Sequence, residues 1–146
     1  LIDTLVENEY DVTVLDISSE ALRILSNRHG KNLNFIHGDL SKPIELGEYE
    51  IWHDRAVLHF LLSDNERDAY VSNLESCIPR GGYAVIETFS TDGVPMCCGL
   101  NLHRYDENLL ESLLGENWNL IESRRHIHIN PFGDSRPYIS TLFKRN

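Results

Sequence analysis

The sequence predicts an α/β domain with a doubly wound, mostly parallel sheet that carries an antiparallel strand at its C-terminal edge. Three observations lead to this prediction. Strand-like apolar segments alternate with segments of helical spacing, the loops between them are short, and the last two strand candidates follow each other without a helix. The 146 residues show no internal repeat and no linker, so we expect a single domain over 1–146.

The N-terminal part predicts two strands, each preceded by a helix. Apolar residues at i, i+3 and i+4 indicate an opening helix, and a Ser-Ser-Glu sequence followed by a helical pattern indicates a capped second helix that Gly30 ends. The β-rich segments DVTVLD and LNFIH are typical of buried parallel strands. The expected elements are a helix over 2–6, a strand over 11–16, a helix over 18–30 and a strand over 33–37.

The remaining chain predicts four more strands and two more helices. Ser63 and Glu66 form a capping box that begins one helix, and Asp106 caps a second helix that Gly115 ends. The expected strands cover 49–54, 83–89, 118–129 and 136–143. The last two should pair antiparallel, with a turn over 130–133, because no crossover of helical length separates them.

Composition narrows the kind of partner. The formal net charge is −10, which opposes nucleic-acid binding, because neutralising phosphates requires a basic face. No apolar run approaches the roughly 20 residues that a membrane span needs. The three cysteines are odd in number and lack metal-ligand spacing, which suits a reducing cytoplasm. We therefore expect a cytoplasmic protein with a small or basic partner, bound to neither nucleic acid nor membrane, and no metal.

Two aspartates follow predicted strands at the edge where open α/β sheets bind ligands. Asp16 ends the first strand, where a carboxylate can accept two hydrogen bonds from a ribose diol; the glycine-rich turn expected about 20 residues upstream would fall just before Leu1. Asp16 can equally be a capping residue for the next helix. Asp39 follows Gly38 after the second strand, as a turn residue or as a contact for an adenine edge.

Four segments together resemble class I, Rossmann-like S-adenosylmethionine (SAM)-dependent methyltransferases. VTVLDIS, FIHGDL, HDRAVLHFL and PRGGYAVIETF occur in the order and spacing of that family, and the DRAVxHFL segment resembles a group related to seven-strand lysine methyltransferases. The resemblance implies SAM as the cofactor. It implies that Asp16 holds the ribose, with Ile17 beside it, that Asp39 and the Leu40 amide frame the adenine, and that His53, Asp54 and Arg55 line the methionine end.

The family's first strand and its GxGxG turn do not occur in this sequence. The resemblance therefore implies an N-terminally truncated domain that lacks a central strand buried on both faces. Three or four missing aliphatic side chains correspond to about 5–10 kcal/mol, which is close to the whole stability of a domain. On this basis the 146-residue chain is expected not to bind SAM measurably and to self-associate through the gap.

The resemblance implies direct displacement of the methyl group onto a small-molecule or protein lysine acceptor that enters over 89–104. A base is needed only for a protonated acceptor, and His53 and His59 are the candidates, with packing as the alternative role of His59. His126 and His128 share a strand face, which alternation explains without a metal. Two other interpretations remain: a non-catalytic remnant or partner subunit, and a nicotinamide-dependent oxidoreductase, for which no Tyr-x-x-x-Lys sequence is present.

Overall fold

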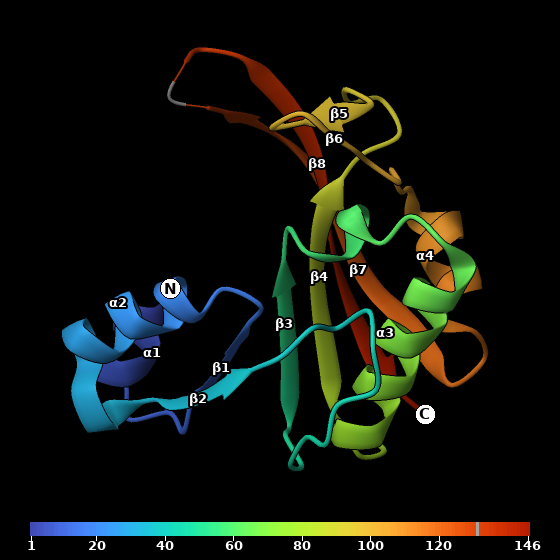
Figure 1. The fold of residues 1–146 in the computed structure, drawn as a ribbon. Coiled ribbons are helices and arrows are strands. Elements are labelled where there is room, and N and C mark those ends of the chain that lie inside the picture. The colour runs from blue at the N-terminus through green and yellow to red at the C-terminus, as the bar shows by residue number, and fades with distance from the viewer. Residues whose placement is uncertain (131) are drawn as a thin grey trace. The chain divides into compact units, whose positions relative to one another are not determined.

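The computed structural model describes residues 1–130 and 132–146, which form two compact units, Leu1–Leu40 and Ser41–Asn146. Figure 1 shows the helices and strands that belong to each unit. Among the described residues, no helix is both long and apolar enough to cross a membrane.

The first unit contains the predicted order of helix, strand, helix and strand. Its two strands pair in parallel, with Val14 opposite Phe35. Ser18 caps the second helix, because its hydroxyl accepts a hydrogen bond from the Ala21 N–H at 3.2 Å, and Gly30 ends that helix at a φ of +59°. The elements are α1 (Ile2–Glu7), β1 (Thr13–Asp16), α2 (Ser19–His29), the 3₁₀ helix η1 (Gly30–Asn32) and β2 (Asn34–His37).

The second unit is built on one mixed sheet of four strands in the order β3-β4-β8-β7. The strands are β3 (Ile51–Arg55), β4 (Tyr83–Phe89), β7 (Trp118–Ile129) and β8 (Ser135–Arg145). β3 and β4 pair in parallel, whereas β8 is antiparallel to both β4 and β7. The α/β class is confirmed. The mostly parallel, doubly wound sheet is not what these residues form, because β8 lies between β4 and β7 and makes two of the three pairings antiparallel.

The long C-terminal hairpin confirms the predicted antiparallel pairing of the last two strands. The register runs from Trp118 opposite Arg145 to Ile129 opposite Ser135, with a bulge between Leu120 and Glu122. The turn expected over 130–133 includes residue 131, which lies outside the described residues. The side-chain oxygen of Asn130 accepts the N–H groups of the residues at both 132 and 134.

Two helices cover one face of this sheet (Figure 1), α3 (Asp64–Cys77) and α4 (Glu107–Leu114). The core lies between them and alternate residues of the strands. Its fully buried side chains include Tyr70, Leu74, Ile86, Leu110, Ile139 and Phe143. The opposite face of β3 and β4 carries the exposed side chains of Ile51 and Tyr83, so the described helices of this unit leave it open.

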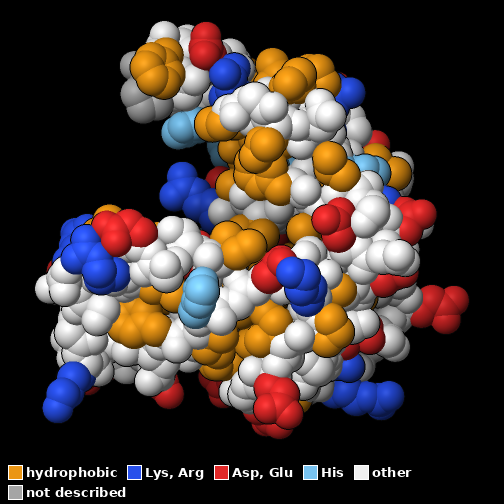
Figure 2. Space-filling view, in the orientation of Figure 1, with side chains coloured by type: hydrophobic (Ala, Val, Ile, Leu, Met, Phe, Trp, Pro, Cys, Tyr) orange, Lys and Arg blue, Asp and Glu red, His pale blue; other side chains and the backbone are white. Residues whose placement is uncertain are grey.

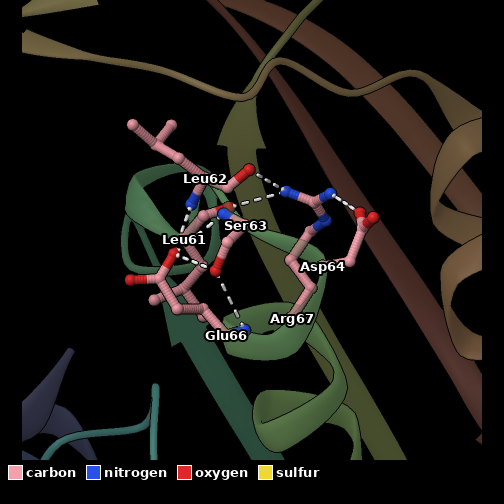
Figure 3. A network of polar contacts seen from close by, with 6 residues as sticks. All are labelled: Leu61, Leu62, Ser63, Asp64, Glu66 and Arg67. Atoms are coloured by element: carbon pink, nitrogen blue, oxygen red, sulfur yellow. Dashed lines mark hydrogen bonds and ion pairs between the residues drawn. The ribbon is translucent and has the colours of Figure 1, made fainter.

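The start of α3 confirms the predicted capping box (Figure 3). The Ser63 hydroxyl accepts from the Glu66 N–H at 3.3 Å, and the Glu66 carboxylate accepts from the Ser63 N–H at 2.8 Å. Arg67 donates to the carbonyls of Leu61 and Leu62 and pairs with Asp64. These bonds fix the segment that leads from the 3₁₀ helix η2 (Leu58–Phe60), after β3, into α3.

The region between β4 and α4 contains a hairpin that the sequence did not predict. It consists of β5 (Met96–Cys97) and β6 (Leu100–Asn101), which pair antiparallel. Figure 2 shows apolar side chains gathered at the end of the second unit that carries this hairpin. Asp106 then caps α4 by accepting from the Leu109 N–H at 2.9 Å, as predicted, and Gly115 ends the helix.

Candidate functional site

In the first unit, the two predicted aspartates lie at one edge of the parallel pair. β1 ends at Asp16, and Asp39 follows two residues after the end of β2. Because the carboxyl ends of parallel strands meet at the same edge, both residues lie at the edge of the strand pair where the sequence analysis expected them. The Gly38 N–H donates to the Asp16 carbonyl at 3.2 Å and holds the two strand ends together.

The carboxylate of Asp16 has a turn-forming role and spare acceptor capacity. Its Oδ1 atom accepts the Ser18 N–H at 2.7 Å, which is the capping role that the sequence left open. Within the described part of the chain, Oδ2 accepts no hydrogen bond. A carboxylate offers about four lone-pair sites, so one turn bond leaves enough capacity to accept a ribose diol.

An apolar residue follows each of the two aspartates in the sequence. Ile17 is 65% exposed beside Asp16, and its carbonyl lies 2.9 Å from Nε2 of His37. Asp39 is half-buried, and the Leu40 side chain that follows is buried. This edge therefore combines carboxylates with an exposed aliphatic side chain, a combination that suits a sugar joined to a flat, apolar ring.

In the second unit, β3 sends its three predicted site residues to opposite faces of the sheet. His53 pairs with Val85, and Arg55 with Glu87, on the open face. Asp54 lies between them in sequence and points to the helix-covered face, where it is 3% exposed. The expected cluster of His53, Asp54 and Arg55 is thus divided by strand alternation.

Asp54 organises the turn that follows β3. Its carboxylate accepts the Val57 N–H at 2.9 Å, the Leu58 N–H at 3.1 Å and the Tyr70 hydroxyl at 2.9 Å. Burial raises the pKa of Asp54, and these three donors oppose that shift. All three bonds hold the chain in place, so the geometry gives Asp54 a positioning role.

The turn contains a strained residue. Ala56 has a φ of +71°, a left-handed conformation that a non-glycine residue rarely adopts. The Ala56 N–H donates to the Glu87 carbonyl at 2.9 Å, so Asp54 and β4 together hold it there. Strain of this kind costs about 1–3 kcal/mol, and the hydrogen bonds to Asp54 and β4 compensate for it here.

Glu87 lies at the centre of the polar groups on the open face. Its carboxylate is 3.3 Å from Nε of Arg55, accepts the Ser140 hydroxyl at 3.1 Å and lies 4.0 Å from Nε2 of His126. The His126 ring stacks on Tyr138 at 5.9 Å. Sequence reasoning missed Glu87; the available signal was a single acid inside the otherwise apolar strand YAVIETF.

The two candidate bases have different surroundings. His53 is exposed on the open face; partial burial lowers its pKa, and the charge of Glu87 opposes that shift. His59 is 1% exposed, its Nδ1 atom lies 3.1 Å from Thr88 Oγ1, and its ring packs on Phe89 at 4.8 Å. Burial lowers the pKa of His59 to about 4. The environment of His59 is that of a packed core histidine, whereas His53 is accessible.

His126 and His128 share the open face, as strand alternation predicted, and both rings contact Tyr138. Within the described residues, no group of three or more His, Cys, Asp or Glu side chains is arranged to hold a metal ion.

Comparison with known proteins gives a fold relationship. No protein-family model matches the sequence, and no curated protein matches it. Among solved structures, the chain is similar to a SAM-dependent methyltransferase from Methanosarcina mazei, with a TM-score of 0.81 and 16% identity, over 99% of this chain and 86% of that one.

Two further solved structures that are similar to this chain contain bound S-adenosylhomocysteine. The 1,6-didemethyltoxoflavin-N1-methyltransferase of Burkholderia thailandensis, with bound 1,6-didemethyltoxoflavin and S-adenosylhomocysteine, matches at a TM-score of 0.74 and 19% identity, over 99% of this chain and 66% of that one. The N-methyltransferase NodS of Bradyrhizobium japonicum, also with S-adenosylhomocysteine, matches at a TM-score of 0.72 and 14% identity, over 92% of this chain and 66% of that one. The fold is therefore that of SAM-dependent methyltransferases.

Proposed function

We propose that the protein transfers the methyl group of SAM to a small-molecule or protein lysine acceptor by direct displacement. The observation that carries the proposal is the pair of aspartates, Asp16 and Asp39, at the carboxyl ends of adjacent parallel strands in a fold shared with SAM-dependent methyltransferases. The cytoplasm is the expected compartment, because three cysteines without a disulfide pattern suit a reducing environment.

The residues of the first unit fit the adenosyl part of the cofactor. Asp16 would accept the ribose hydroxyls through the oxygen that its turn bond leaves available, and Asp39 with the Leu40 amide would contact the adenine edge. The exposed Ile17 side chain would cover one face of the adenine ring, which removes apolar surface from water on binding.

The residues of the second unit fit the methionine part. Arg55 carries a guanidinium on the open face, and a guanidinium is the side chain best suited to a carboxylate such as that of methionine. His53 lies on the same face. Asp54 would act indirectly from the helix-covered face, because its hydrogen bond with Val57 holds the strained turn at Ala56 and thereby positions the end of β3.

When bound, the cofactor supplies a methyl group on a positively charged sulfur, which leaves readily. The protein's task is then to position the acceptor in line and to exclude water. For an acceptor that arrives protonated, His53 is the proposed base, because it is accessible and its lowered pKa keeps the imidazole neutral near pH 7. His59 is assigned to packing.

The segment over residues 89–104 supplies the proposed acceptor surface. It contains the β5–β6 hairpin, with the exposed apolar side chains of Met96 and Leu100. These side chains favour a small, partly apolar acceptor. A protein lysine is the alternative, because a formal net charge of −10 attracts a basic segment and the DRAVxHFL sequence resembles a group related to lysine methyltransferases.

Two strand edges lack a partner within the described residues. β1 pairs on one side with β2, and β3 pairs on one side with β4. The resemblance to methyltransferases implies a further strand that leads into the glycine-rich turn. We therefore expect full activity only when such a strand is supplied, and the 146-residue chain to associate through these edges. Sedimentation at increasing concentration checks the association; a single monomeric species throughout would contradict it.

The function is tested with a chain extended at its N-terminus by the family's strand and GxGxG turn. Release of S-adenosylhomocysteine is measured with a panel of small amines and thiols and with lysine-containing peptides. Turnover with the small acceptors supports the proposed class, and turnover with the peptides alone selects the lysine alternative. Cofactor binding without turnover on any acceptor would favour the non-catalytic interpretation, and binding of a nicotinamide dinucleotide in place of SAM would favour the oxidoreductase.

A matched pair of variants tests the assignment of the base. His53→Asn should lower kcat at a pH where the acceptor is protonated, and raising the pH should restore it, because a deprotonated acceptor needs no base. His59→Asn should lower stability without this pH-dependent rescue. A pH-dependent rescue of His59→Asn but not of His53→Asn would instead make His59 the base and give His53 the structural role.

A further inference from the structure

Two adjacent cysteines form the tip of the β5–β6 hairpin. Cys97 pairs with Leu100, and the two residues between them, Cys98 and Gly99, have φ values of +52° and +80°. Positive φ at both central residues is the pattern of a type I′ hairpin turn, in which Asn or Asp is usual at the first position and Gly at the second. Cysteine is not among the residues that favour this conformation, so the first position holds a thiol at a cost in backbone energy.

The turn brings the two thiols together. The Sγ atoms of Cys97 and Cys98 lie 3.7 Å apart, and both cysteines are free. Cys98 is exposed and Cys97 is half-buried, whereas the third cysteine, Cys77, is fully buried inside α3. The hairpin therefore presents an accessible pair of thiols at a fixed spacing, and the rest of the chain offers no comparable thiol.

The spacing suits one centre bound by both sulfurs. Two sulfurs held at about 2.3 Å from one tetrahedral centre are roughly 3.8 Å apart. No group of three or more His, Cys, Asp or Glu ligands occurs among the described residues, so the protein supplies only two donors at the hairpin. A structural zinc site needs four ligands, which disfavours zinc. A trivalent metalloid that keeps one substituent of its own needs only two ligands from the protein.

We infer that Cys97 and Cys98 form a binding site for a trivalent arsenic centre that carries one organic substituent. In the reaction, two As–S bonds replace two As–OH bonds. Each thiol hydrogen leaves with one hydroxyl group as water, and arsenic stays trivalent, so neither an oxidant nor a reductant is required. The two cysteines lie within the segment 89–104 that is proposed as the acceptor surface, but the test of this site measures arsenic binding and does not depend on methyl transfer.

The surroundings of Cys97 favour its protonated thiol form. Partial burial and the neighbouring Cys98 thiol raise the pKa of Cys97, and the nearby Arg136 guanidinium opposes that shift. A protonated thiol is a poor nucleophile toward alkylating agents and disulfides, because the thiolate is the reactive form. Exchange with an arsenic-bound hydroxyl group releases each thiol hydrogen as water, so the overall reaction starts from the protonated thiols that this environment favours at Cys97.

The experiment treats the 146-residue chain with phenylarsine oxide and measures the adduct by intact-mass spectrometry. One phenylarsenic group per chain, with loss of two hydrogens, is expected. Cys97→Ser and Cys98→Ser should each weaken binding by about 10²–10⁴-fold, because the second bond is then no longer intramolecular. Cys77→Ala is the matched control and should bind like the unaltered chain.

Competition separates chelation from simple thiol addition. The adduct of the unaltered chain should survive excess glutathione and be reversed by a dithiol, whereas any adduct of the single-serine variants should be lost to glutathione. Iodoacetamide labelling of denatured samples confirms that each variant keeps its remaining thiols reduced. Absence of the adduct, or equal resistance to glutathione in a single-serine variant, would overturn the inference.

Discussion

His59 offers a sharp test of the structure of the second unit, because its buried ring should make stability depend on pH. The imidazole is 1% exposed and lies between Phe60 and Phe89, with its Nδ1 atom 3.1 Å from Thr88 Oγ1. Burial lowers its pKa from 6.5 to about 4. The unfolded chain therefore binds a proton at His59 between these two values, and the folded chain does not.

The sign and size of the effect follow from linkage. Stability contributed by the neutral ring is present above the unfolded pKa of 6.5 and is lost as the pH falls toward the folded value of about 4. Between about pH 7.5 and about pH 5, this loss amounts to about 2 kcal/mol of unfolding free energy. The variant His59→Asn keeps a polar atom for Thr88 but removes the titrating group.

The assay compares urea unfolding at the two pH values. His59→Asn should be less stable than the unaltered chain near pH 7.5, because it loses packing with the two phenylalanines, but its stability should fall by about 2 kcal/mol less on acidification. His128→Asn, which changes an exposed ring, is the matched control and should retain the full pH dependence. Equal acid sensitivity of His59→Asn and the unaltered chain would show that the ring is not buried and neutral.

Two further substitutions test the interactions that position the end of β3. Ser63→Ala removes half of the capping box with Glu66 and should lower the unfolding free energy by about 0.5–2 kcal/mol, measured by urea titration; an unchanged midpoint would mean that the cap is not formed in solution. Tyr70→Phe removes a buried hydroxyl that donates to Asp54 at 2.9 Å and accepts from the Trp52 indole at 3.1 Å. This variant should lower the unfolding free energy by about 1–3 kcal/mol and shift the tryptophan fluorescence. No change in either quantity would contradict the buried network.

Local signals in the sequence were sufficient for most elements of the fold. The caps at Ser18, Ser63 and Asp106 were predicted correctly, because a cap depends on side-chain and backbone atoms within three residues. The strand over 83–89 and the pairing of the last two strands were also predicted, since apolar patterning and short connections determine them. The β5–β6 hairpin was missed, because strands of two residues give no periodic signal.

The parts that failed depend on tertiary placement. The position of β8 between β4 and β7 depends on contacts between segments far apart in the sequence, and local patterning does not contain this information. The same holds for Asp54: alternation separates it from His53 and Arg55, but only the packing of α3 shows which side is buried. Glu87 has an evident role only once Arg55, Ser140 and His126 surround it.

The central claim, that the edge formed by β1 and β2 binds the adenosyl group, is tested most directly by calorimetry with SAM on the N-terminally extended chain. Asp16→Ala removes the proposed ribose acceptor, and Asp11→Ala removes an equally hydrogen-bonded aspartate that precedes β1, at the other end of the strand. Loss of charge-assisted bonds worth about 1.5–3 kcal/mol predicts affinity about 10–150-fold weaker for Asp16→Ala and unchanged for Asp11→Ala. Equal affinity in both variants, with unaltered circular dichroism, would contradict the account.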